Sequence, residues 1–337
     1  MINGNGRDAG DRMRRRELIL SIGSVAAVSM SAAYGQQSAK PPIIGFLVAG
    51  TPASHGAWVA AFTQRLSELG WTDGRNVKIE YRWAAGDIRQ TTDFAAEFVQ
   101  QKVDLIVTSA SGVVAAKQAT STIPIVFAAY GDAVANGIVG SLARPGGNVT
   151  GLSVQPSELS SKRLELLRDI IPNVRRLAAL VNTHLVGVAQ EVVGIRTASA
   201  KLNIEANILE IQTAEDIDAA LATLTGQTDA LYVYSEPLTN ANKDKIIKAA
   251  TAAKIPTIFG FREFVDAGGL ISYGPNFIDL FARAAEFADK ILRGATPADM
   301  PVQQPVKFDF IINLKAAKAL GLNISETVLT RADEVIE

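Results

Sequence analysis

The sequence contains no cysteine, only two histidines and almost no net charge. Without cysteine the chain forms no disulfide, no thiolate metal site and no lipidated N-terminal cysteine, and it has no cysteine nucleophile. With 33 Lys plus Arg against 34 Asp plus Glu, there is no broad positive field for nucleic acid and no strongly acidic surface. We therefore expect a globular protein that does not bind nucleic acid.

The usual equipment of catalysis is also missing. The two histidines, His55 and His184, do not stand at metal-ligand spacing. No glycine-rich phosphate loop ends in Lys-Ser or Lys-Thr, and no Gly-x-Ser-x-Gly elbow occurs. We expect no enzyme activity, no metal and no cofactor; a carboxylate-based hydrolase is the alternative, because Asp and Glu are abundant.

Residues 1–35 have the pattern of a signal peptide. Arg14 to Arg16 form a basic region, Leu18 to Met30 form a short apolar segment, and small residues lead to a predicted cleavage site near Gly35. The apolar segment is shorter than the roughly 20 residues that span a bilayer. We expect export to the periplasm by the Sec or the twin-arginine route, with translation starting at Met1 or Met13; a frayed helix of a cytosolic protein is the alternative.

From Pro41 the chain alternates apolar strands with amphipathic helices, which is typical of parallel sheets covered on both faces. The segment 141–154, with Pro145, Gly146 and Gly147, predicts the end of a helix running to Leu142 and the start of an extended crossing. Ser54 is expected as the N-cap of the first helix and Gly70 as its stop. The expected strands are 43–49, 77–81, 103–108, 123–129, 148–154, 177–181, 204–211, 230–234 and 256–259.

The strand and helix pattern restarts after the crossing, which predicts a duplicated α/β unit. Further extended segments at 268–276 and around Pro297, Pro301 and Pro305 predict two more crossings, and three crossings permit a hinge. We expect a first lobe from residues 41–153 plus 275–300. The second lobe is expected from residues 154–274 plus 301–337.

Several motifs together resemble a known family. They are Arg144-Pro-Gly-Gly-Asn-Val-Thr-Gly151, Ala119-Thr-Ser-Thr-Ile-Pro-Ile-Val126, Gly268-Gly-Leu-Ile-Ser-Tyr-Gly-Pro275, Asn313-Leu-Lys-Ala-Ala-Lys-Ala-Leu-Gly321 and Arg331-Ala-Asp-Glu-Val-Ile-Glu337. From about residue 41 to the C-terminus the chain is similar to the tryptophan/tyrosine-type ABC transporter substrate-binding proteins.

The resemblance implies the fold of a type I periplasmic binding protein, with two flavodoxin-like doubly wound lobes joined by three hinge crossings. It also implies a small-molecule ligand and an ABC permease of the inner membrane as partner. We expect the protein to be a monomer. One segment departs from the family: Asp132-Ala-Val-Ala-Asn136-Gly137 has Ala133 where the family commonly has proline, which predicts a looser loop at the cleft. A sensor module that acts with a membrane receptor is the alternative function.

Candidate ligand contacts follow the strands of the first half, because open α/β sheets bind ligands at the carboxyl ends of their strands. Ser109 and Ser111 open a helix, where a carboxylate is favoured, although serines there also serve as simple N-caps. For His55 we expect either a contact with the ligand or the role of a solvated or capping residue. For Asp132 we expect either a bond to an ammonium group of the ligand or the role of a helix N-cap. The remaining candidates of this half are Thr51, Ser54 and Tyr130.

In the second half, Glu236 is the candidate partner for an α-ammonium; the alternative is an exposed loop carboxylate. Tyr273 is expected either to stack on a ligand or to pack in the hinge. Phe259 and Phe261 are expected in the core. Asn182, Thr183 and Ser235 complete the candidates. The predicted ligand is a small carboxylate-bearing molecule, and the family resemblance favours an aromatic amino acid.

Overall fold

The computed structural model describes residues 40–154, 156–185, 188–224 and 226–337. The expected signal peptide lies outside these residues. Residues 42–337 form one unit, which contains two separate β-sheets. None of the helices in the described part of the chain is both long and apolar enough to cross a membrane.

The first sheet has five strands in the order β2-β1-β3-β4-β5, all of them parallel. Every residue of β3, β4 and β5 is buried, so both faces of the sheet need a covering layer. The strands are β1 (Ile43–Val48), β2 (Lys78–Trp83), β3 (Leu105–Ser109), β4 (Ile125–Tyr130) and β5 (Val149–Ser153).

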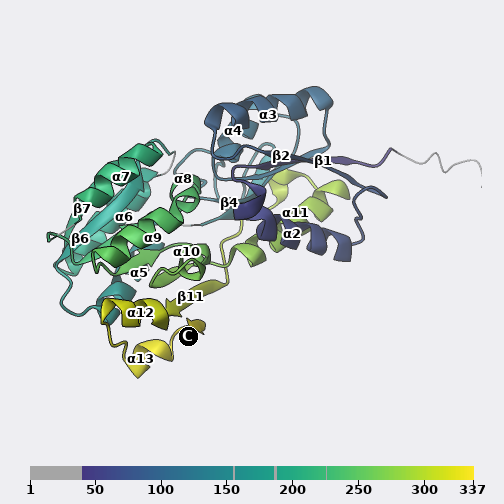
Figure 1. Ribbon diagram of the computed structural model, residues 1–337. Coiled ribbons are helices and arrows are strands. Elements are labelled where there is room, and N and C mark those ends of the chain that lie inside the picture. Colours follow the sequence, from purple (N-terminus) through teal and green to yellow (C-terminus); the bar gives the residue numbers. More distant parts are fainter. Residues whose placement is uncertain (1–39, 155, 186–187, 225) are drawn as a thin grey trace, which may run out of the picture. The chain divides into compact units, whose positions relative to one another are not determined.

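Helices cover both faces of this sheet (Figure 1). Helices α3 (Ile88–Gln101) and α4 (Ser111–Ala119) pack over one face around Phe98 and Phe127. Helix α2 (Pro52–Glu68) and helix α11 (Phe277–Leu292) pack together over the other face, where Phe46, Phe62 and Phe281 are buried. Helix α11 comes late in the chain, so the first sheet is completed by a segment that returns from the second.

The second sheet has seven strands in the order β12-β11-β10-β9-β8-β6-β7, parallel except for the β10–β11 pair. The strands are β6 (Arg176–Asn182), β7 (Glu205–Ile211), β8 (Ala230–Val233), β9 (Thr257–Phe259), β10 (Ile271–Pro275), β11 (Phe308–Asn313) and β12 (Glu334–Ile336). Strands β11 and β12 were not among the strands expected from the sequence. Strand β11 begins three residues after Pro305, at the end of the third expected crossing.

Helices also cover both faces of the second sheet, and each face has its own cluster of buried hydrophobic residues. One cluster contains residues of α5 (Pro156–Ile170), α6 (Val188–Lys201), α12 (Leu314–Leu320) and α13 (Glu326–Leu329). The other contains residues of α7 (Ala214–Ala222), α9 (Lys243–Ala252) and α10 (Arg262–Asp266). A short helix, α8 (Pro237–Ala241), follows β8, and a 3₁₀ turn, η1 (Pro297–Asp299), follows α11.

The chain passes three times between the two sheets: from β5 to α5, from β10 to α11 and from η1 to β11. The first and third passages are hydrogen-bonded to each other, because Gln303 N donates to Gly151 O and Ser153 N donates to Gln303 O. Two α/β lobes joined by three crossings are therefore confirmed.

Two local predictions were wrong. The expected helix through Leu142 is absent, and residues 131–142 form turns: Lys117 Nζ binds the carbonyls of Gly137 and Ile138, which a continued helix would use, and Gly137 has φ +64°. The N-cap of α2 is Thr51 rather than Ser54, which takes the third helical position of a capping box with Thr51. Gly70 follows the end of α2 with φ +98°, as expected of a helix stop.

Candidate functional site

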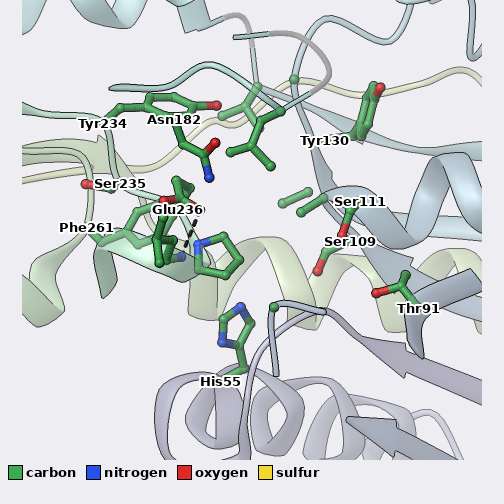
Figure 2. A pocket seen from close by; sticks show the side chains of 18 of the residues that line it. His55, Thr91, Ser109, Ser111, Tyr130, Asn182, Tyr234, Ser235, Glu236 and Phe261 are labelled. Carbon is green, nitrogen blue, oxygen red and sulfur yellow. Dashed lines mark hydrogen bonds between the residues drawn. The ribbon is translucent and has the colours of Figure 1, made fainter. Parts of the chain in front are cut away.

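A cavity of about 490 Å³ is lined by residues of both sheets' loops. Side chains at or just after the ends of β6 and β8 lie on one side of the cavity, side chains at or just after the ends of β3 and β4 face them, and His55 points into the space between (Figure 2). Seven of the residues predicted as ligand contacts line it: His55, Ser109, Ser111, Tyr130, Asn182, Ser235 and Glu236. The carboxyl ends of parallel strands thus form the wall that the sequence predicted.

The first wall contains the N-terminus of α4. Its N-cap is Ala110, with φ 48° and ψ −127°, and it has no side-chain capping hydrogen bond. The flanking serines are therefore not simple N-caps, which was the alternative interpretation. Ser109 is buried and Ser111 half-buried at the cavity. An uncapped helix start beside two hydroxyls favours an anionic group, because its free N–H groups carry positive partial charge.

Glu236 stands on the opposite wall and is 5 % exposed. Its carboxylate caps α8 by accepting from Leu238 N at 2.8 Å and from Thr239 N at 2.9 Å. Burial raises the pKa of Glu236, while these two hydrogen bonds and the Asn182 side chain oppose that rise. No described Lys, Arg or His forms an ion pair with it. The alternative of an exposed loop carboxylate is wrong, and the site presents a buried negative charge that lacks a cation.

Asn182 and Ser235 flank Glu236 on the same wall. Asn182 is buried at the end of β6, and its Oδ1 accepts from His184 N. The Ser235 hydroxyl accepts from Gly260 N at 2.7 Å and so joins the ends of β8 and β9. Asn182 therefore orients the local chain, and Ser235 fixes the spacing of the two strand ends behind Glu236.

Aromatic side chains form the floor of the cavity. Trp58 stacks on Phe277 with ring centroids 4.4 Å apart and meets Phe261 edge-on at 5.6 Å. Trp58 Nε1 also donates to Glu263 Oε1 at 3.0 Å, so a helix of the first lobe is bonded to a helix of the second. Phe259 lies in the core as expected, but Phe261 lines the cavity as well. The floor is thus suited to an apolar or aromatic group.

His55 lies beside this floor, with its ring 4.4 Å from that of Trp58 and only 5 % of the residue exposed. Burial lowers its pKa to about 4, so the imidazole is neutral near pH 7. Its Nδ1 is 2.8 Å from Ser54 Oγ. His55 is therefore a neutral hydrogen-bonding group rather than a solvated or capping residue.

Tyr130 lines the first wall, and its hydroxyl is buried without a hydrogen-bond partner in the described residues. Burial raises the pKa of Tyr130, which keeps the phenol protonated. A protonated hydroxyl without a partner at a cavity wall is available to a polar group of a ligand.

The other predicted contacts lie outside the cavity lining. Thr51 and Ser54 form the capping box of α2, Asp132 caps its own loop, and Thr183 is half-buried beside Asn182. Tyr273 lies on β10 just before the second crossing and stacks on Phe308 at 5.9 Å, as the hinge-packing alternative predicted.

A buried ion pair in the wall that contains Glu236 was not predicted from the sequence. Arg163 Nη1 donates to Glu191 Oε1 at 3.1 Å and to the Tyr232 hydroxyl at 2.6 Å, and both charged residues line the cavity. Arg163 Nε also donates to the carbonyl of Tyr273 at 2.7 Å. Because Arg163 and Glu191 read as ordinary polar positions of two separate helices, nothing in the sequence signals that they pair.

No group of three or more His, Asp or Glu side chains is placed to hold a metal ion within residues 40–154, 156–185, 188–224 and 226–337. The cavity combines a hydrogen-bonding anion site, an unpaired carboxylate opposite it, and an aromatic floor between them.

Known proteins match most of the chain. A family described as "ABC transporter substrate binding protein" matches residues 51–336. A relative named "Tyrosine-binding protein", from Clostridioides difficile (strain R20291), is 34 % identical over 262 residues, which cover 77 % of this chain and 75 % of the relative.

Solved structures of similar proteins have the same fold. An ABC domain from Streptococcus pneumoniae in complex with L-Trp superposes with a TM-score of 0.83 at 26 % identity, covering 88 % of this chain and 100 % of that one. The ligand-free, open structure of a substrate-binding protein with adhesive properties from Clostridium difficile gives a TM-score of 0.67 at 30 % identity, covering 88 % and 99 %. The described conformation is thus more similar to that of the ligand complex than to the open one.

Proposed function

Because the chain belongs to the family of ABC transporter substrate-binding proteins, we propose that it captures an aromatic amino acid in its inter-lobe cavity. The family is extracytoplasmic and delivers small molecules to an ABC permease. In our proposal the protein works in the periplasm as a monomer and releases the amino acid to such a permease.

The observation that carries the proposal is the carboxylate of Glu236. A buried carboxylate without a cation is costly, and the cost falls when a cationic group of a ligand enters the site. An α-ammonium is a cation that donates in several directions, so it can bind Glu236 while Leu238 N and Thr239 N keep their hydrogen bonds.

The opposite wall supports the other half of a zwitterion. The uncapped start of α4, with Ser109 and Ser111, offers backbone and hydroxyl donors to a carboxylate. A ligand with both charges therefore contacts both lobes at once. Such contacts stabilise the closed state selectively, because an open cleft separates the two walls.

The aromatic floor supports an aromatic side chain between the two charges. Trp58, Phe261 and Phe277 present ring faces and edges to the cavity, and aromatic pairs gain about 0.5–1.5 kcal/mol beyond the burial of their area. The volume of about 490 Å³ is ample for an amino acid with ordered water. The named tyrosine-binding relative and the L-Trp complex of the similar pneumococcal domain support the same ligand class.

Titration calorimetry on the purified protein tests the proposal. The panel contains L-tyrosine, L-tryptophan, L-phenylalanine, L-leucine, ribose and adenine. We expect the aromatic amino acids to bind most tightly and leucine more weakly, because it cannot stack on the aromatic floor. Binding of ribose or adenine with no heat from any amino acid would show that the ligand assignment is wrong.

A further inference from the structure

A second contact between the lobes lies outside the cavity lining. Gln190 Nε2 of helix α6, in the second lobe, donates to Asn136 Oδ1 of the loop after β4, in the first lobe, at 3.3 Å. The two residues are 54 positions apart and half-buried. This contact joins α6 to the loop after β4, whereas the bond from Trp58 to Glu263 joins α2 to α10 beside the hinge.

The remaining amide atoms of this pair are buried and unpaired in the described part of the chain: Asn136 Nδ2, a donor, and Gln190 Oε1, an acceptor. Two primary amides can exchange a second, reciprocal hydrogen bond when they lie face to face, because each has one donor group and one acceptor. Leaving both atoms buried and unpaired is unfavourable, so a small further closure that joins them is favoured.

We propose that Asn136 and Gln190 form an amide clasp that holds the closed state and sets the rate at which the ligand leaves. The inference rests on the proposed function, since a binding protein of this kind retains its ligand by staying closed. It assigns a role in retention to two residues that line no part of the cavity.

The first-lobe half of the clasp is held firmly. Asn136 N donates to Asp132 O, and Lys117 Nζ of α4 donates to the carbonyls of Gly137 and Ile138 at 2.7 and 2.6 Å. Ala133 N donates to Ser153 Oγ at 3.2 Å, a bond that proline at this position would lack. The loop predicted to be looser for want of that proline is therefore tied to the first crossing.

The second-lobe half is held by its neighbour in the sequence. Glu191 follows Gln190 and accepts from Arg163, which also donates to the carbonyl of Tyr273 just before the second crossing. The clasp is thus connected to the hinge through a buried ion pair. The chain segments that carry the two amides are thus anchored within their own lobes, which reduces the entropy lost when the clasp forms.

The clasp exists only when the lobes are closed, so its loss destabilises the closed state and leaves the open state unchanged. Ligand associates with the open form, so its association rate is expected to stay the same or to rise only as far as the open population of the ligand-free protein grows. Its dissociation rate is expected to rise about 5- to 10-fold when one amide is removed, the effect of a hydrogen bond or two. Loss of a residue that contacts the ligand would instead change the affinity by different factors for ligands of different chemistry.

The absence of cysteine makes the test direct. Asp93→Cys on α3 and Ala219→Cys on α7, both exposed, place a donor and an acceptor dye on different lobes. Energy transfer between the dyes reports closure without ligand, and stopped-flow mixing with L-tyrosine and L-tryptophan gives both rate constants.

The variants are Asn136→Ala, Gln190→Ala, both together, and the exchange of Asn136→Gln with Gln190→Asn, which keeps the combined reach of the amides. Val193→Ala is the matched control, because Val193 is exposed on the same helix. We expect faster dissociation in each single variant, no further rise in the double alanine variant, partial recovery in the exchange variant and no change in the control.

Unchanged dissociation in both single variants, or equal changes in association and dissociation, would overturn the clasp. Absence of binding by any aromatic amino acid in the unsubstituted protein would instead refute the proposed function. Energy transfer in the ligand-free protein then decides the clasp: lower transfer in Gln190→Ala than in Val193→Ala supports it, and equal transfer rejects it.

Discussion

Replacing Glu236 with glutamine removes the charge that the proposed ligand needs and keeps nearly the same shape. One side-chain oxygen remains to accept from Leu238 N or Thr239 N, so the start of α8 loses at most about 1 kcal/mol of capping. The substitution also removes a buried carboxylate that has no cation, which offsets part of that loss. The protein is therefore expected to fold.

The effect on binding is much larger. A hydrogen bond to a charged group contributes about 1.5–3 kcal/mol, and only 5 % of Glu236 is exposed, so solvent screens its carboxylate little. At 1.4 kcal/mol per tenfold change, the dissociation constant of L-tyrosine is expected to rise about 10- to 150-fold.

Calorimetry with a second ligand isolates the ammonium contact. The compound 3-(4-hydroxyphenyl)propanoate is tyrosine without its amino group. We expect it to bind the unsubstituted protein weakly and to bind Glu236→Gln no more weakly. If the substitution weakened tyrosine and this analogue by the same factor, Glu236 would not bind the ammonium, and the reasoning from its buried charge would be wrong.

Three further substitutions test the structure around the site. Burial lowers the pKa of His55 from 6.5 to about 4, so the stability that neutral His55 contributes is present above pH 6.5 and is lost as the pH falls toward 4. When the pH is lowered from 7 to 5, the free energy of unfolding, measured with denaturant, should therefore fall by about 2 kcal/mol less in His55→Phe than in the unsubstituted protein. Arg163→Met is expected to lower stability by about 3–5 kcal/mol by leaving Glu191 buried and unpaired, and adding Glu191→Leu should recover much of it in the same assay. Gly274→Ala would place a Cβ 2.0 Å from the Gly260 carbonyl, so a fall in melting temperature corresponding to about 3 kcal/mol or more is expected; an unchanged melting temperature would refute this close approach.

The strands of both sheets were predictable because each is a short apolar run between turn residues. Such runs fit parallel strands that are buried on both faces, as β3 and β4 are. The loop after β4 was not predictable in the same way. Its apolar residues suggested a helix, but the Lys117 ammonium binds the carbonyls of Gly137 and Ile138, which a helix would have used.

The cavity was partly predictable for a geometric reason: parallel strands bring their carboxyl ends to one edge, so the residues after them meet. This identified Ser109 and Glu236. It missed Trp58, which lies within α2 rather than after a strand, and Arg163, whose partner is 28 positions away. Contacts between separate helices have no signature in one sequence.

The central claim is that an amino acid bound between Glu236 and the start of α4 holds the two lobes together. A crystal structure of the protein grown with L-tyrosine or L-tryptophan tests it most directly. The account predicts closed lobes, with the ligand's ammonium within about 3 Å of the Glu236 carboxylate and its carboxylate at Ser109 and Ser111. Closed lobes with the ligand reversed or elsewhere, or open lobes with an empty cavity at saturating amino acid, would contradict it.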